Sequence, residues 1–307
     1  MKKIFICLFL ILKVGYVDSQ SLDTLPFFQK SEIPNKSRLR LLNYSSVGLY
    51  SVSMSWLYTQ WYRDYPQSSF HFFNDNSEWL QMDKYAHFFD AYSIAKPLTH
   101  LYQWAGYDNI KATIYGCGVA FLFQTTVEVF DGFSSEWGFS TGDLACNTGG
   151  ILLFGAQQLG WQEQRIILKY SFHQTKYSKY RPEILGSNVA ENILKDYNGL
   201  TSWLCVNPYS FMNKNSKFPK WLNVAIGFGA EGMTGGDFNP KEAHGKLIPE
   251  FERYRQYYLA IDIELSKIDT KSKFVNGLFK LVNIIHLPTP ALEFSHGRRM
   301  IGRMLYF

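Results

Sequence analysis

The hydrophobic pattern of the chain changes its period near Gln164. Before this residue, long apolar segments bounded by capping residues and glycines are typical of helices. After it, apolar residues alternate with small or polar ones, which is typical of strands with one apolar face. The pattern therefore predicts an α+β fold, in which an N-terminal helical bundle at 45–160 precedes an antiparallel, strand-rich half at 161–307.

The first half is predicted to contain helices at 47–62, 77–106, 109–132 and 140–160. In the second helix, Ser77 is a candidate N-cap, Gly106 is a candidate stop, and Pro97 is expected to kink or split the helix. The third helix carries no charge over 112–127, a length between a buried core helix and a short membrane span.

The second half is predicted to contain strands at 165–173, 221–232 and 257–266, with weaker candidates at 291–296 and 302–307. One amphipathic helix is expected at 271–286. Two arrangements fit this alternation. Either the apolar face of the sheet packs on the helices, or the strands resemble an outer-membrane β-barrel with the apolar face outward. Closed single-chain barrels begin at about eight strands, and the pattern supports about five to seven.

Residues 1–19 are predicted to be a signal peptide. Two lysines precede the apolar run IFICLFLIL, and small residues stand three and one positions before a cut after Ser19. Cys7 lies inside the apolar run, not at this cut, so the sequence shows no lipid-attachment site. Residues 20–44 are polar and mixed and are predicted to form a leader. The chain is therefore expected to be exported, to the periplasm or in association with the outer membrane.

The aromatic content of 17% favours contact with a membrane interface, although a β-rich core would also explain it. The net charge of +5 is mild, and basic residues are interleaved with acidic ones, so nucleic-acid binding is not expected. The expected partner is membrane lipid or another envelope component. Cys117, Cys146 and Cys205 are expected to be free buried thiols, with a Cys117–Cys146 bridge as the alternative.

Polar pairs interrupt three of the predicted apolar helices. The stretch QMDKYAHFFDAY places charged groups on one helical face among aromatic residues, because positions i, i+4 and i+7 coincide there. The next two helices each carry a pair near one end. If the helices pack as a bundle, these side chains could meet at one level. The set comprises Asp83, Lys84, His87, Glu128, Asp131, Asp143 and Asn147.

Burying an unpaired carboxylate costs several kcal/mol, so carboxylates in an apolar interior should find partners. Such a set could perform acid–base chemistry, with Asp83 orienting His87 as the base and with Glu128 and Asp143 as acids. The same oxygen-rich set could hold Mg²⁺, Mn²⁺ or Ca²⁺, and no other cofactor is expected. Capping and solvated roles explain these residues as well, since an acid such as Asp143 is usual in the first turn of a helix.

The segments MDKYAHFFDAYSI and EVFDGFSSEWGFSTGDLACNTGG resemble the paired signature of VanZ-like proteins. That signature is an Asp-Lys-x-x-His helix, a segment with a Glu, and an Asp-x-x-x-Asn-x-x-Gly helix. Residues 45–235 resemble more closely the long form of the YfiM-like family, described as predicted periplasmic lipoproteins of unknown function. The resemblance implies one site formed by Asp83, Lys84, His87, Glu128, Asp143, Asn147 and Gly150.

Neither family implies a known reaction. The chain also lacks the Gly-x-Ser-x-Gly, His-Glu-x-x-His and Cys-x-x-Cys motifs that would indicate an enzyme. The expected function is therefore a non-catalytic binding or structural role in the cell envelope. The alternatives are a metal- or acid/base-dependent hydrolase or transferase that acts on envelope lipid or peptidoglycan, and an outer-membrane β-barrel-like protein.

Overall fold

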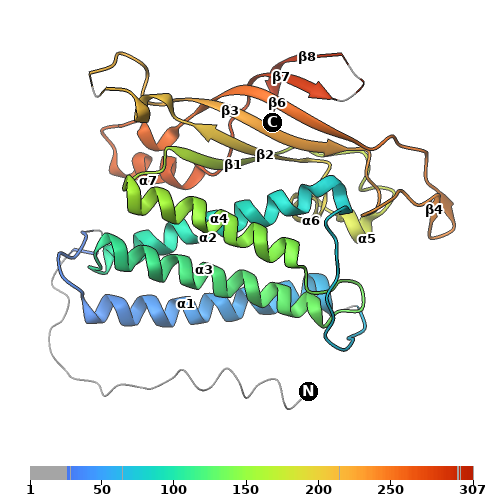
Figure 1. Cartoon of the computed structure of the whole chain (residues 1–307), viewed down its shortest axis with the longest axis horizontal. Coiled ribbons are helices and arrows are strands. Elements are labelled where there is room, and N and C mark those ends of the chain that lie inside the picture. Colours follow the sequence, from blue (N-terminus) through green and yellow to red (C-terminus); the bar gives the residue numbers. More distant parts are fainter. Residues whose placement is uncertain are drawn as a thin grey trace.

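The computed structural model describes residues 26–306, except Phe28, Asp64, Lys214, His296 and Arg298. A helical half lies against a strand-rich half, so the predicted α+β fold is confirmed (Figure 1). The predicted signal peptide and Phe307 lie outside the described residues.

The helical half is built from four long helices, and three shorter helices follow in the second half. A π-helical turn at Tyr58–Tyr62 extends the first helix, and a 3-10 turn at Glu78–Gln81 precedes the second. The helices are α1 (Lys36–Leu57), α2 (Met82–Trp104), α3 (Asn109–Gly132), α4 (Thr141–Gly160), α5 (Pro182–Leu185), α6 (Val189–Lys195) and α7 (Lys273–Val282).

Helix α1 begins inside the predicted leader, so the prediction of a leader through residue 44 is wrong. Asn35 caps the helix by accepting bonds from the backbone amides of Ser37 and Arg38. The buried guanidinium of Arg38 bonds the Trp104 carbonyl and lies 4.6 Å from the centre of the Trp104 ring. The polar composition misled the prediction because most residues of this helix face solvent while Arg38 and Leu42 anchor it.

Helices α2, α3 and α4 pack closely because glycines stand at the contacts. A Cβ at Gly116 of α3 would lie 2.6 Å from the Thr99 amide nitrogen of α2, and one at Gly150 of α4 would lie 2.0 Å from the Phe88 carbonyl oxygen. Neither helix could approach α2 as closely with a side chain at these positions. Helix α2 is continuous through Pro97, which is exposed, so the proline does not split it.

The start of α2 differs from the prediction. Ser77 does not cap the helix, and its hydroxyl donates instead to Asp237 Oδ1 at 2.8 Å. Trp79, Leu80 and Gln81 adopt left-handed φ values of 49°, 52° and 66°. This backbone conformation is uncommon for residues other than glycine, and it delays the start of the helix to Met82.

The second half contains one six-stranded antiparallel sheet in the order β1-β2-β3-β6-β7-β8, and β4 and β5 form a separate small hairpin. The sequence did not reveal β2, because this strand is buried on both faces and does not alternate. The strands are β1 (Ile166–Phe172), β2 (Leu200–Val206), β3 (Leu222–Glu231), β4 (Glu242–Ala243), β5 (Lys246–Leu247), β6 (Tyr254–Ile263), β7 (Thr289–Ser295) and β8 (Ile301–Tyr306).

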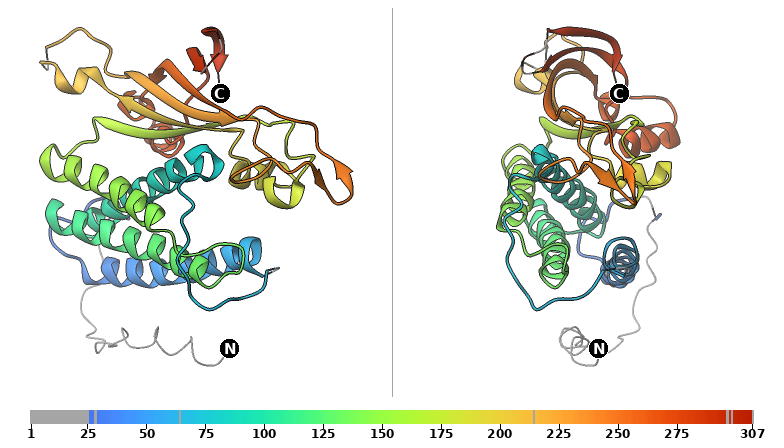
Figure 2. Two further views of the ribbon diagram at one scale, coloured as in Figure 1. Left: turned by 45° about the vertical axis from the view of Figure 1, so that its right-hand side comes forward. Right: turned by 90° about the vertical axis from the view of Figure 1, so that its right-hand side faces the viewer.

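The apolar face of the sheet packs on the helices only in part. Leu168 of β1 and Leu204 of β2 join the core formed with α2 and α4, and Phe228 of β3 stacks on Tyr85 of α2 at 4.9 Å. On β3, β6 and β7 the same face is exposed to solvent, because the sheet curves away from the helices (Figure 2). The exposed apolar residues of this face are Val224, Ile226, Tyr257, Leu259, Ile261, Leu292 and Phe294.

The opposite, concave face of the sheet encloses a buried ion network. The ammonium of Lys169 lies 2.9 Å from Asp262 Oδ2 and donates to Asn283 Oδ1 at 3.1 Å. Tyr306 of the last strand bonds Thr201 of β2 and Tyr258 of β6, which fixes the curl of the sheet. The three cysteines after the predicted cut are free thiols, as expected, but only Cys205 is buried, and Cys117 and Cys146 are partly exposed.

Candidate functional site

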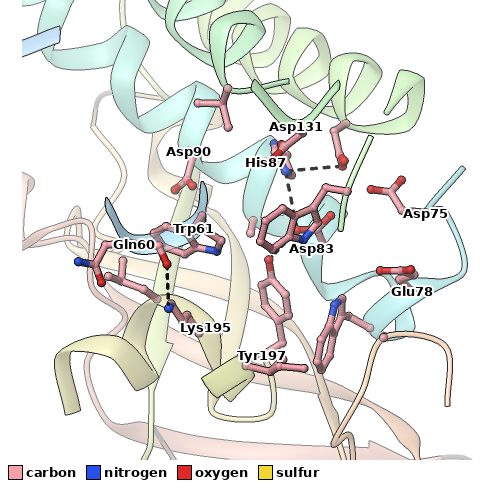
Figure 3. A pocket seen from close by; sticks show the side chains of 18 of the residues that line it. Gln60, Trp61, Asp75, Glu78, Asp83, His87, Asp90, Asp131, Lys195 and Tyr197 are labelled. Atoms are coloured by element: carbon pink, nitrogen blue, oxygen red, sulfur yellow. Dashed lines mark hydrogen bonds and ion pairs between the residues drawn. The ribbon is translucent and has the colours of Figure 1, made fainter. Parts of the chain in front are cut away.

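A cavity of about 1220 Å³ lies where the helical half meets the strand-rich half. Its walls come from the end of α1 and the turn that follows, from α2 and α3, and from β1, α5 and α6 (Figure 3). The predicted polar cluster lies at this cavity, and Asp83, His87 and Asp143 line it directly.

The ammonium group of Lys84 lies between three carboxylates. Its ammonium lies 2.6 Å from Asp75 Oδ1, 2.6 Å from Asp143 Oδ1 and 3.2 Å from Asp83 Oδ2. Burial alone would lower the pKa of Lys84, but Asp83 and the hydrogen bonds to Asp143 and Asp75 raise it above its usual value. Lys84 is therefore a permanent cation that neutralises part of the negative charge.

His87 is surrounded by acceptors. Its Nδ1 lies 3.3 Å from Asn147 Oδ1 and 3.5 Å from Glu128 Oε1, and its Nε2 lies 3.7 Å from both Asp83 Oδ1 and Asp143 Oδ1. Burial opposes its charge, but Asp83, Asp143 and Glu128 raise the pKa of His87 to about 9. The ring is therefore an imidazolium at neutral pH, which does not suit the predicted role of a general base.

Two of the acids hold protons near neutral pH. Burial is the largest cause, and repulsion from neighbouring carboxylates adds to it, so the pKa of Glu128 rises to about 8 and that of Asp143 to about 7. Asn147 Nδ2 lies 3.5 Å from Glu128 Oε1, while Glu128 Oε2 is buried without a hydrogen-bond partner among the described residues. Several groups therefore titrate between about pH 7 and 9, as at many acid–base sites.

The structure brings together six of the eight residues predicted for the cluster. Asp131 lies apart from the centre and accepts a bond from Tyr62 Oη at 2.7 Å. Gly150 contributes close packing of α4 on α2 and offers no polar group. The six that meet are Asp83, Lys84, His87, Glu128, Asp143 and Asn147.

Three further members of the cluster, Asp75, Tyr197 and Gln124, were not predicted from the sequence. Asp75 lies in a loop and pairs with Lys84, and Ser140 donates to it at 2.6 Å. Tyr197 of the strand-rich half donates to Asp83 Oδ1 at 2.6 Å, and Gln124 donates to Asn147 Oδ1 at 3.0 Å. No helical or strand period connects Asp75 and Tyr197 to the cluster, because only the tertiary fold brings them there. Gln124 was detectable, since it precedes Glu128 by one helical turn.

Asp83, His87 and Asp143 could also hold a divalent metal ion, because one ligand atom of each lies within 4.8 Å of the others. Metal binding would require His87 to lose its proton and Lys84 to move from Asp143. As it stands, the cluster balances its charges with protons and an ammonium group.

Residues 71–155 match the model of a family described as predicted periplasmic lipoprotein (DUF2279). This part of the chain extends from the loop before Asp75 to the middle of α4, so it contains every cluster member that the helical half supplies. The family description agrees with the predicted export to the periplasm. No curated protein and no solved structure matches the chain.

Proposed function

We propose that this protein is a membrane-associated envelope protein that binds an amphipathic ligand in the cavity. The observation that carries the proposal is the cavity of about 1220 Å³, which has apolar walls and the polar cluster on one side. Small-molecule sites have this composition, with mostly apolar walls and a few convergent polar groups. This volume exceeds the usual range of about 300–1,000 Å³ for such sites, which favours a ligand with a long apolar part.

Exposed apolar side chains support the membrane association. Monomeric soluble proteins rarely expose large contiguous apolar patches. Helix α3 is long and apolar enough to cross a membrane, and only 28% of its most apolar window is buried. Helix α7 turns its apolar side outward as well. Examples of side chains more than half exposed are Val47, Leu49 and Val52 on α1, Ile110 and Leu122 on α3, and Phe274 and Leu281 on α7.

Filling the cavity tests the proposal. Ala86 lines the cavity on α2, so Ala86→Trp should occupy the space of the ligand. Ala156→Trp on the exposed side of α4 is the matched control, because it adds the same side chain outside the cavity. We expect Ala86→Trp to abolish the co-purification of lipid, measured by mass spectrometry of an organic extract, and Ala156→Trp to retain it. Equal lipid content in both variants would contradict the proposal.

Acid–base or metal-dependent catalysis is a second candidate, because Asp83, His87 and Asp143 face the cavity together. In this case the imidazolium of His87 would act as an acid toward a bound ester or phosphate, with Glu128 and Asp143 exchanging protons. Hydrolysis of an extracted envelope lipid by the wild type, and its loss in His87→Gln with lipid binding retained, would establish this candidate. Lipid that stays intact with or without added Mn²⁺ or Zn²⁺ would favour binding alone.

A further inference from the structure

We infer that the ligand of the cavity is a lipid whose head group bears a primary ammonium ion. This inference rests on the proposed function and specifies the chemistry of its ligand. It follows from the charge of the lining, from the Asp90 carboxylate, and from the aromatic residues that line the cavity.

Acids outnumber cations in the lining. The cations that line the cavity are Arg181, Lys195 and the imidazolium of His87. All three are engaged: Arg181 pairs with Glu183, Lys195 donates to the Gln60 carbonyl oxygen and lies over the Trp61 ring, and His87 lies among the acids of the polar cluster. An anionic head group would therefore meet a negative surface, whereas a cation would find complementary charge. The lining acids are Asp75, Glu78, Asp83, Asp90, Asp131, Glu136, Asp143, Glu183 and Asp237.

Among the lining acids, Asp90 and Glu78 have carboxylates with no hydrogen bond or ion pair to a described residue, and Asp90 is the one drawn next to Trp61. Its side chain projects from α2 toward the side of the cavity that carries Gln60 and Trp61 (Figure 3). No hydrogen bond or ion pair to its carboxylate is found among the described residues. Asp90 is an exposed residue by surface area, and it lines the cavity. Burial raises the pKa of Asp90 to about 6, which leaves it ionised at neutral pH.

Aromatic rings also line the cavity, and Trp61 is drawn next to Asp90 in Figure 3. Trp56 and Trp61 lie edge to face at 6.2 Å between ring centres, and Trp137 contacts both Tyr62 at 5.8 Å and Tyr65 at 5.0 Å. Ring faces attract ammonium groups, and the attraction increases where water is excluded. Rings beside a free carboxylate therefore favour an ammonium over a neutral or anionic head group.

The apolar remainder of the lining favours a lipid over a small amine. Leu57 of α1, Ile94 of α2, Phe123 of α3 and Ile193 of α6 line the cavity beyond the acids. Aliphatic side chains bind hydrocarbon by excluding water from both surfaces. Helix α1, which forms one wall, also exposes apolar residues on its outer side, so the cavity adjoins a surface suited to lipid.

Amphiphiles that share the same twelve-carbon tail and differ in the head group test the head-group preference. The protein is titrated at pH 7.5 and low salt with dodecylamine, dodecanol and dodecanoate below their aggregation limits, and with butylamine as the tail-less control. Binding is followed by the fluorescence of the tryptophans that line the cavity. For an ion pair in a partly desolvated site, we expect dodecylamine to bind about tenfold more tightly than dodecanol and dodecanoate to bind most weakly.

Asp90→Asn should reduce the preference for dodecylamine over dodecanol to about threefold or less, because it removes the charge and keeps the shape. Asp269→Asn is the matched control at an exposed acid outside the cavity and should keep the wild-type preference. Circular dichroism shows whether Asp90→Asn folds. If it does not, the affinities of the wild-type protein for the three twelve-carbon compounds still test the ammonium preference, and 0.5 M NaCl should weaken the binding of dodecylamine.

The outcomes separate the two proposals. If none of the twelve-carbon compounds binds, the proposed function fails together with this inference. If all three bind equally, the cavity binds amphiphiles but the ammonium assignment is overturned. Butylamine binding as tightly as dodecylamine would overturn the assignment to a lipid. An unchanged preference in Asp90→Asn would overturn the role of Asp90.

Discussion

The His87 ring is positively charged inside the protein because the polar atoms nearest its two nitrogens are hydrogen-bond acceptors. Asp83 and His87 share one helical face, which the sequence predicted from their spacing. The spacing did not predict the protonation of the ring, because Glu128, Asn147 and Asp143 come from other helices. At this scale the sequence identified the residue types, and the packing of three helices determined their ionisation.

The stability of the protein should fall as the pH rises from 5 to 9. The pKa of His87 is raised to about 9 in the folded state from 6.5, so its stabilisation is complete below pH 6.5 and is lost as the pH passes 9. The raised pKa of Glu128, about 8 against 4.5, acts in the same direction. We expect the free energy of unfolding, measured with urea, to fall by several kcal/mol between these limits, because each pKa unit corresponds to about 1.4 kcal/mol.

In His87→Gln this pH dependence should become shallower, because the variant removes the titrating ring. His244→Gln is the control, since His244 is an exposed histidine of the strand-rich half. A wild-type unfolding midpoint that rises with pH, or an identical slope in His87→Gln, would contradict the assigned protonation.

Gly150 holds α4 against α2 through the absence of a side chain. Gly150→Ala should destabilise the protein by about 1–3 kcal/mol, because the added Cβ meets the Phe88 carbonyl oxygen and forces the helices apart. Gly118→Ala in α3 meets nothing within 4 Å and should stabilise the helix by about 1 kcal/mol. Thermal unfolding of both variants measures the difference, and a neutral Gly150→Ala would show that the helices separate without cost.

At the scale of elements, α3 and α4 were predicted almost to the residue, because glycines lie at their ends. The structure shows that Asp108 and Ser140 cap them. The left-handed turn before α2 was not predictable, since Trp79 and Leu80 carry no signal for that conformation. The alternating strands were recognised, but alternation alone did not show how far the apolar face would be covered. Curvature decides that coverage, and Tyr306 fixes the curvature through long-range bonds.

The ion network on the concave face holds β1 to β6. Lys169→Met removes the cation and leaves Asp262 and Glu264 buried without it. We expect a loss of about 3–5 kcal/mol in the free energy of unfolding, as for other broken buried ion pairs. Lys273→Met at the exposed start of α7 should change stability by less than about 0.5 kcal/mol. Comparable unfolding midpoints for the two variants would show that the network does not stabilise the sheet.

At the scale of the whole molecule, apolar side chains face outward from both halves. We expect the purified protein to float with vesicles of envelope lipids in a density gradient. The double variant Leu49→Gln and Val52→Gln should reduce the bound fraction severalfold, because both side chains are about two-thirds exposed on α1. The matched control is Ser45→Gln and Ser51→Gln on the same helix. Loss of flotation in the control alone would contradict a hydrophobic contact.

Helix α1 forms one wall of the cavity but is anchored by few side chains. Arg38, Leu42 and Met54 are its buried residues. A helix with so few buried side chains can move outward at small energetic cost, while α2, α3 and α4 stay closely packed at their glycine contacts. A lipid could then enter sideways from a bilayer that touches α1, so that its hydrocarbon never crosses bulk water.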